Sequence, residues 1–268
     1  MNLRDIMHPD PERVRGEYPL ANAAARMVKL GIRHLPVVDD DGKLTGLLTD
    51  ADVFRRGSFL DARLVDPRGW VAHDAAHDDL RCHAVMQPVE VTLNPELAAS
   101  IALAELHRSD QDALVVVDSR FRPVGIVTEH DVLALALDEL DSDVLTQAIA
   151  SSPVDAIEVD APANEAHTRL MAQPFRHLIV TAGGSLHGVL SIRDLVAQDV
   201  PRRGNEPLNA LLSFTKVQSA RPETPLVEVV RTMKAQKIGC MPLVDDRDEP
   251  VGIVTRRDVI AWVIGHNV

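Results

Sequence analysis

The sequence predicts an α/β fold, of the α+β kind, made of four βαββα units that pair sheet to sheet. One short phrase occurs four times: glycine, two aliphatic residues, Thr or Ser, two variable residues and Asp. Its copies are Gly46-Leu47-Leu48-Thr49-Asp50-Ala51-Asp52, Gly125-Ile126-Val127-Thr128-Glu129-His130-Asp131, Gly188-Val189-Leu190-Ser191-Ile192-Arg193-Asp194 and Gly252-Ile253-Val254-Thr255-Arg256-Arg257-Asp258. Apolar residues at helical spacing follow each copy. A unit of about sixty residues can hardly bury its apolar sheet face alone, so adjacent units should pair.

Composition argues against several classes of protein. The 268 residues carry 28 basic and 40 acidic side chains, a net charge of −12. Such a surface repels polyanions, so general nucleic-acid binding is not expected, although a small phosphate ligand needs only a local basic pocket. The apolar runs are far shorter than the about 20 residues of a membrane span, and the start lacks the apolar stretch of a signal peptide. With only Cys82 and Cys240 there is no disulfide framework, and we expect a cytoplasmic protein without a membrane partner.

The first unit shows every element of the repeat. Apolar residues between positions 20 and 30 follow helical spacing, and Gly31 is placed to end that helix. Residues 35 to 38 are expected to form a strand, and Asp39-Asp40-Asp41-Gly42 is a hairpin turn that leads into a second strand over residues 44 to 48. The phrase and its helix then close the unit.

Residues 57 to 84 interrupt the pattern with a segment that resembles a loop. His73 and His77 lie four residues apart there and could share one helix face. Two ligands do not complete a zinc site, so we interpret the segment as a polar connection and expect no metal site.

The second unit opens with Val85-Met86-Gln87-Pro88 and an alternating strand over residues 89 to 93. We predict a helix from about Pro95 to Ser109 with Asn94 as its cap, because proline is favoured at the first helical position. Strands over residues 113 to 117 and 124 to 127 and a helix over residues 131 to 140 complete the unit. The acidic stretch at residues 138 to 143 marks the boundary between the halves of the chain.

The last two units repeat this order. In unit three we expect a strand at residues 156 to 159, a helix over 164 to 173, a strand at 177 to 180 and a turn at Gly183-Gly184. In unit four the corresponding elements cover residues 217 to 220, 226 to 236, 241 to 244 and 245 to 249. The predicted organisation is a first pair at residues 1–140, with units at about 1–57 and 84–140 around a loop at 58–83, and a second pair at 141–268, with units at about 144–200 and 207–268.

The phrase permits two interpretations. In the first, Thr or Ser caps a helix and the Asp three residues on complements the positive helix end. In the second, the exposed N–H groups and hydroxyl bind a phosphate while the nearby carboxylate binds two sugar hydroxyls. All four copies keep Asp where a capping box prefers Glu or Gln, which favours the second interpretation.

The units resemble cystathionine-β-synthase-type domains, called CBS domains, and two tandem copies resemble a Bateman module. The features that carry the resemblance are the four phrases, the strands Leu35-Pro36-Val37-Val38-Asp39 and Met241-Pro242-Leu243-Val244-Asp245, and the lead-ins Ile6-Met7 and Val85-Met86. They cover nearly the entire chain apart from the loop. The resemblance implies a regulatory module that binds adenosine-containing ligands such as AMP, ADP, ATP or S-adenosylmethionine in clefts between paired units.

The resemblance also implies roles for particular residues. The aspartates would hold the ribose hydroxyls: Asp52, Asp131, Asp194 and Asp258. The hydroxyl residues and nearby basic residues would meet phosphate: Thr49, Thr128, Ser191, Thr255, Arg193, Arg256 and Arg257. Arg33-His34 and Arg176-His177 precede the middle strands of units one and three and are either further phosphate ligands or solvated loop residues. Unit three departs from the pattern at Ser191 and in its turn, and unit two lacks proline in its middle strand, so we favour the unit-four cleft, then units one and two, then unit three.

Three functions follow as hypotheses. The first is a non-catalytic sensor, expected as a homodimer, that transmits ligand binding to an unknown protein target and has no catalytic cofactor. The alternative is a structural scaffold with empty clefts whose paired units only dimerise. An enzyme hidden in the cleft is disfavoured because no Ser-His-Asp order, Walker-type Gly-Lys-Ser/Thr motif or complete metal set occurs. The sequence leaves open which adenosine ligand binds and how many clefts fill.

Overall fold

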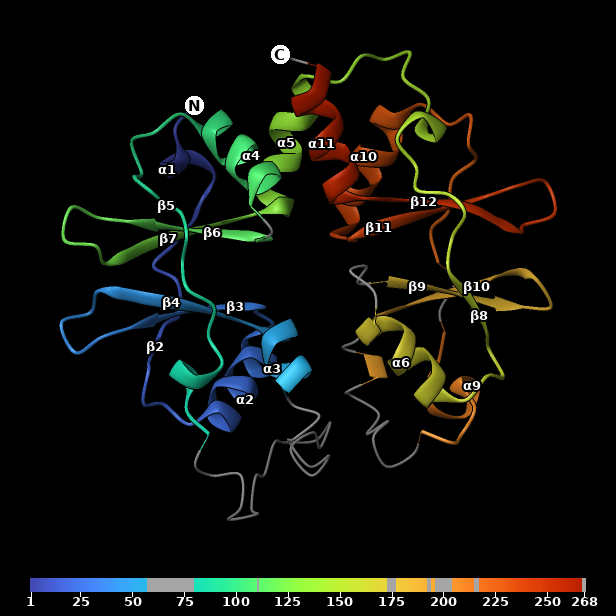
Figure 1. The fold of residues 1–268 in the computed structure, drawn as a ribbon. Helices are drawn as coiled ribbons and strands as arrows, with labels where there is room; N and C mark the ends of the chain where they lie inside the picture. Colours follow the sequence, from blue (N-terminus) through green and yellow to red (C-terminus); the bar gives the residue numbers. More distant parts are fainter. Residues whose placement is uncertain are drawn as a thin grey trace.

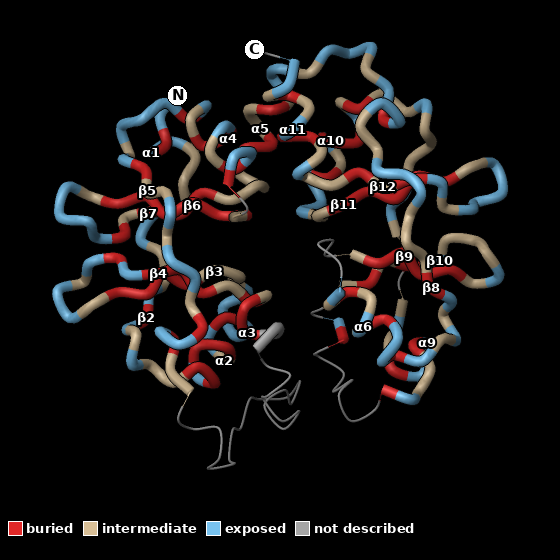
Figure 2. Tube along the Cα trace, viewed as in Figure 1, coloured by how far each residue is buried: buried red, intermediate tan, exposed pale blue. Residues whose placement is uncertain are grey.

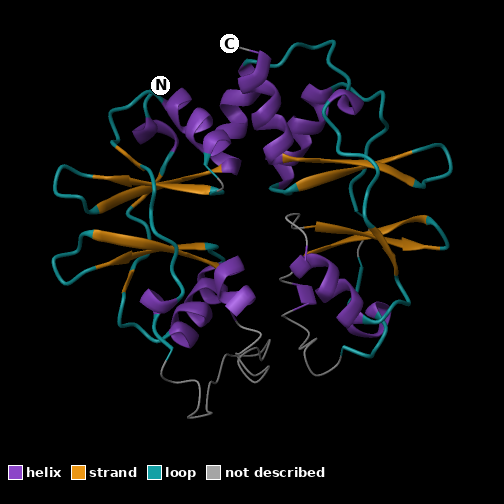
Figure 3. Cartoon of the chain, viewed as in Figure 1, coloured by secondary structure: helices purple, strands orange, loops and turns teal. Residues whose placement is uncertain are grey.

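The computed structural model describes residues 1–56, 80–109, 111–172, 177–191, 194–195, 204–214 and 217–266. Four small sheets are each covered on one face by helices, which confirms the α/β class (Figure 1). Figure 3 shows the sheets of units one and two stacked on one side of the molecule and those of units three and four on the other. The predicted loop, with His73 and His77, lies outside the described residues apart from its last few positions.

The first unit forms the predicted elements in the predicted order. They are β2 (Val14–Arg15), α2 (Leu20–Leu30), β3 (His34–Val38), β4 (Leu44–Thr49) and α3 (Asp50–Arg56). β3 pairs with β2 in parallel and with β4 antiparallel, so that Val37 lies opposite Gly46. Helix α2 ends at Gly31, whose φ of 66° places it in the left-handed region, as the sequence predicts.

The second unit contains β5 (Thr92–Leu93), α4 (Ala99–Arg108), β6 (Ala113–Val117), β7 (Pro123–Thr128) and α5 (Glu129–Asp138). The predicted helix start at Pro95 is wrong, because α4 begins at Ala99. The carbonyls of Pro95 and Leu97 accept the N–H groups of Arg4 and Leu3, at 3.1 and 2.9 Å. These bonds to the short N-terminal helix α1 (Leu3–Ile6) hold the stretch before α4 out of the helical conformation.

Units three and four follow the same plan. Unit three contains β8 (Ala156–Glu158), α6 (Ala163–Ala172), β9 (His177–Ala182) and β10 (Ser185–Ser191), and unit four contains α10 (Leu226–Gln236), β11 (Cys240–Val244), β12 (Pro250–Thr255) and α11 (Arg256–His266). Helix α10 has the predicted bounds, and both glycines of the predicted turn, Gly183 and Gly184, have positive φ. The strand expected at residues 217 to 220 is reduced to one bridge between Ala220 and Leu243.

The segment that precedes each unit packs on the partner unit. β1 (His8–Pro9) precedes unit one but pairs with β7 of unit two. η3 (Cys82–Ala84) leads to Gln87, which bridges to Leu47 of unit one. η4 (Thr146–Ala148) and α9 (Leu208–Leu211) likewise lead into units three and four but contact units four and three: Ser151 bridges to Ile253, and Leu208 lies in the unit-three core. Each pair of units is therefore interlocked through exchanged segments.

Two kinds of apolar contact join the units. The sheets of units one and two bury a cluster made of Leu44, Leu47, Ala113, Val115, Val117 and Ile126. Helices α4 and α5 share a larger core with α10 and α11, so that units two and four are joined through their helices. Figure 2 shows the buried residues along the strands and this helical contact, and the exposed ones at the hairpin tips. Among the described residues, no helix has the length and apolar character to cross a membrane.

Close approach of the exchanged segments requires the phrase glycines of units one and two. A Cβ on Gly46 would clash with the Met86 side chain and lie 3.0 Å from the Gln87 carbonyl oxygen, and a Cβ on Gly125 would clash with Met7. A Cβ on Gly252 would meet Ala150 at 3.4 Å, an ordinary contact.

We expect Gly46→Ala to destabilise the protein by about 1–3 kcal/mol, because the added methyl overpacks the contact with Met86. Gly252→Ala is the matched control at the equivalent position and should change stability by about 0.5 kcal/mol or less. Urea unfolding followed by circular dichroism measures both. Equal effects of the two substitutions would contradict a packing role for the phrase glycine.

Candidate functional site

The phrase Thr caps the helix that follows it in units one, two and four, and the phrase Asp bonds back to the Thr or Ser in all four units. The Oδ2 atom of the phrase Asp accepts both the backbone N–H and the side-chain hydroxyl of the Thr or Ser three residues earlier. The N–H and hydroxyl distances are 3.1 and 2.6 Å for Thr49 and Asp52, 2.7 and 2.7 Å for Thr128 and Asp131, 2.8 and 2.7 Å for Ser191 and Asp194, and 2.7 and 2.7 Å for Thr255 and Asp258. The capping interpretation therefore accounts for one carboxylate oxygen and for the hydroxyl proton.

The second oxygen of each carboxylate differs between units. Asp52 Oδ1 accepts a hydrogen bond from Gln87 Nε2 at 3.0 Å. Asp131 Oδ1 lies 3.0 Å from His8 Nε2. In the part of the chain that the structure describes, Oδ1 of Asp258 has no polar partner. Capping thus leaves one carboxylate oxygen that a ligand hydroxyl can reach in unit four.

Two positions meet at the inner end of the strand pairs of units one, two and four. The residue that directly follows the phrase Thr donates its backbone N–H to a carbonyl group. That carbonyl belongs to the residue directly before the middle strand of the same unit (β3, β6 or β11). These bonds join Asp50 to Arg33 at 2.9 Å, Glu129 to Asp112 at 3.2 Å and Arg256 to Gly239 at 3.3 Å. Arg33 therefore lies before the middle strand of unit one, where unit four has Gly239, and Arg256 lies at the helix start of unit four, where unit one has Asp50.

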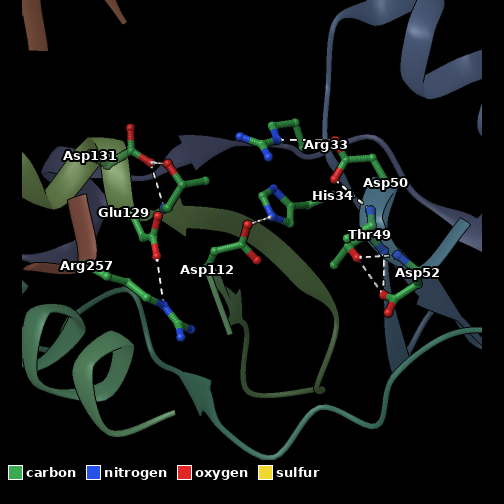
Figure 4. Close-up of polar contacts among 11 residues, drawn as sticks. Arg33, His34, Thr49, Asp50, Asp52, Asp112, Glu129, Asp131 and Arg257 are labelled. Carbon is green, nitrogen blue, oxygen red and sulfur yellow. Dashed lines mark hydrogen bonds and ion pairs between the residues drawn. The ribbon is translucent and has the colours of Figure 1, made fainter. Parts of the chain in front are cut away.

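Carboxylates lie close to three of the predicted basic residues (Figure 4). Arg33 Nε lies 3.3 Å from Asp50 Oδ2, and His34 Nε2 lies 3.4 Å from Asp112 Oδ2. Arg257 Nε donates to Glu129 Oε1 at 3.4 Å, which joins unit four to unit two. Asp50, Asp112 and Glu129 are not among the residues predicted from the sequence. Asp50 and Glu129 occupy the same variable position of the phrase, which was the available signal.

Three buried nitrogen atoms at this centre have no hydrogen-bond partner among the described residues: His34 Nε2, His130 Nδ1 and Arg256 Nε. The His34 side chain is 8% exposed, and its contact with Asp112 lacks hydrogen-bond geometry. Arg256 uses Nη2 to donate to the Lys237 carbonyl at 3.2 Å. A buried polar group without a partner costs about 1–3 kcal/mol, and Arg256 Nε, which can only donate, lacks a hydrogen-bond acceptor here.

Burial and charge set the ionisation of this cluster. Burial lowers the pKa of His130, and the nearby Arg256 lowers it further, while Asp131 opposes them. Burial also lowers the pKa of the Arg256 guanidinium, opposed by Glu129. His130 is therefore held in its neutral form, in which each ring nitrogen can serve as donor or acceptor according to its tautomer.

The remaining predicted ligands are placed only in part. His177 contacts unit four, since a Cβ on Gly239 would lie 3.3 Å from its ring. Arg176 and Arg193 lie outside the described residues. Within the described residues, no group of three or more His, Cys, Asp or Glu side chains could hold a metal ion.

Comparisons with known proteins define the family. The profile of the CBS domain matches residues 3–58, 82–138, 145–200 and 212–265. The chain is 25% identical over 197 residues to the uncharacterized protein MJ1404 of Methanocaldococcus jannaschii, which covers 68% of this chain but only 44% of that protein. It is 24% identical over 248 residues to protein MJ1225 of the same organism, 86% of this chain and 87% of the relative.

Solved structures show the same fold. The crystal structure of MJ1225 superposes with a TM-score of 0.82 at 18% identity, covering 98% of this chain and 99% of the other. A conserved protein from Pyrococcus horikoshii superposes with a TM-score of 0.67 at 18% identity, covering 98% of this chain and all of the other. The four matched segments coincide with the four structural units, and the chain therefore belongs to the CBS domain family, with four CBS motifs in two Bateman modules.

Proposed function

We propose that this protein is a non-catalytic sensor that binds an adenosine-containing ligand, such as AMP, ADP, ATP or S-adenosylmethionine, in clefts between paired CBS units. Binding would change the protein's conformation and its affinity for a partner protein. We place the two pairs at residues 1–140 and 141–268. The observation that carries the proposal is the group of three buried, unpartnered nitrogen atoms on His34, His130 and Arg256.

A phosphate group supplies what this centre lacks. Its oxygens accept hydrogen bonds, and a guanidinium binds them strongly because the bonds are charge-assisted. Arg256 follows the capping Thr255 at the start of α11, where the helix dipole also favours an anion. Two residues on, Asp258 offers its Oδ1 to the hydroxyls of a ribose. Phosphate and sugar would thus contact neighbouring residues of one phrase.

The centre also offers a route for a signal. Arg257 and Glu129 form an ion pair between the first turns of α11 and α5, the two helices that join units four and two. A phosphate bound beside Arg256 would compete with Glu129 for Arg257 and weaken this contact. The packing of the second Bateman module on the first would then depend on ligand.

Neither cysteine has the properties of a catalytic thiol. Burial raises the pKa of the Cys82 thiol to about 11 and that of Cys240 to about 12. Neither forms a thiolate nucleophile at neutral pH.

The second candidate remains a scaffold with empty clefts, whose paired units serve only to form a homodimer. The observation in its favour is that Gln87 and His8 already contact the Asp52 and Asp131 carboxylates. The same binding experiment separates the two functions.

We expect AMP to bind more tightly than 2′-deoxy-AMP, by about tenfold or more, because a hydrogen bond to a carboxylate contributes about 1.5–3 kcal/mol. Asp258→Asn should remove this difference, whereas the exposed Asp246→Asn is the matched control and should retain it. Isothermal titration calorimetry with AMP, 2′-deoxy-AMP, ATP and S-adenosylmethionine provides the measurement, and thermal melting verifies that each variant is folded. Absence of binding by AMP, ATP and S-adenosylmethionine at millimolar concentration would exclude the sensor function.

The affinity for AMP should rise as the pH falls from about 8 to about 6.5. The pKa of His130 lies below its ordinary value of 6.5 in the free protein. A bound phosphate would raise that pKa, so binding takes up protons, with a slope of at most about tenfold per pH unit for one proton. The ligand-free protein should behave oppositely and lose stability below about pH 6.5, because the unfolded chain then binds the proton more readily.

Calorimetry across this pH range compares the unaltered protein with His130→Gln. The exposed His107→Gln, on α4, is the control, and the titration of the phosphate itself is common to all three proteins. A pH slope that is identical in His130→Gln and the unaltered protein would remove His130 from the phosphate site.

A further inference from the structure

Three residues of the exchanged segments occupy the same place in their units. His8 pairs with Ile126, Gln87 bridges to Leu47, and Ser151 bridges to Ile253. In each case the partner is the aliphatic residue directly after the phrase glycine. The three side chains therefore start from equivalent backbone positions beside the phrase of the partner unit.

These equivalent side chains differ in reach. His8 and Gln87 each bring a side-chain nitrogen to 3.0 Å from the free oxygen of the neighbouring phrase carboxylate, Asp131 and Asp52 respectively. Ser151 is exposed and has no contact with Asp258 in the described part of the chain. Asp52 is buried, whereas Asp131 and Asp258 are both half-buried.

The residue directly before each of these side chains is also larger in units one and two than in unit four. Met86 and Met7 press on the phrase glycines of units one and two so closely that no Cβ would fit. At the corresponding position of unit four the residue is Ala150, which leaves room for one. Two consecutive positions thus carry larger side chains beside Asp52 and Asp131 than beside Asp258. In unit three, Phe214 lies against the phrase glycine, Gly188. The next residue, which corresponds to His8, Gln87 and Ser151, lies outside the described residues.

We propose that His8 and Gln87 are built-in occupants of the ribose position in units two and one, and that Ser151 makes the Asp258 cleft the one that a ribose diol enters first. A diol that binds Asp52 or Asp131 must first break the existing contact, so its net gain is small, whereas at Asp258 the carboxylate exchanges only water. The side chain at this lead-in position thereby determines which clefts accept ligand. The inference rests on the proposed function, since it assumes that the phrase carboxylate binds ribose.

Calorimetric titration with AMP tests the inference in the full-length chain. The unaltered protein should bind one AMP tightly. Ser151→Gln, which places at Asp258 the side chain that Asp52 already has, should weaken that binding by about tenfold or more. Ser151→Ala changes the same position without adding reach and should bind within about twofold of the unaltered protein. Gln87→Ala should add a second tight site, because it frees Asp52.

The outcomes separate this inference from the function on which it rests. If Asp258→Asn weakens AMP binding but Ser151→Gln does not, the sensor function stands and the selecting role of the lead-in is wrong. An unchanged number of sites in Gln87→Ala also overturns it, and this variant decides the question if Ser151→Gln fails to fold by thermal melting. Failure of the unaltered protein to bind any adenosine ligand overturns both.

Discussion

The structure depends on the contact between each exchanged segment and the phrase glycine of its partner unit. Because Met86 and Met7 lie directly on Gly46 and Gly125, each unit completes its neighbour's core. The contact buries the apolar face of a sheet that a unit of about sixty residues could not bury alone. It also delivers one polar side chain to the edge of the phrase, so the same exchange that stabilises the pair determines what the phrase carboxylate can bind.

The centre of the molecule combines charges from different units, some of them half-buried and others, such as Arg257, exposed. Arg33 and Arg257 are balanced by carboxylates, whereas Arg256 retains an unpartnered Nε and the neighbouring His130 is kept neutral. In a poorly solvated place such groups interact more strongly with an anion than they would at the surface. The capping bonds do not involve these side-chain nitrogens of Arg256 and His130. They fix the position of the Asp258 carboxylate and of the start of α11.

Much of the fold and part of the site were predictable. Helix α10, the end of α2 at Gly31 and the turn at Gly183 follow the sequence, because apolar periodicity and left-handed glycines act locally. The predicted start of α4 was wrong, because the carbonyl groups of Pro95 and Leu97 accept hydrogen bonds from a segment more than ninety positions earlier in the chain. The strand expected at residues 217 to 220 was also wrong, since only Ala220 forms a bridge there, to Leu243. Strand formation at a sheet edge depends on the neighbouring strand as well as on the local sequence.

For the site, the four pairs of Thr or Ser with Asp could be predicted from the sequence as one of two interpretations, since three-residue spacing at a helix start brings these groups together whatever surrounds them. The family resemblance suggested Arg256, Arg257 and His34 as phosphate ligands, which stays a prediction. Their carboxylate neighbours, and the contacts of His8 and Gln87 with two of the four phrase carboxylates, became visible only in the folded chain. All of these contacts join residues that are far apart along the chain, as Arg257 and Glu129 are. Local sequence patterns do not encode such contacts, because they form only when the units exchange segments and assemble.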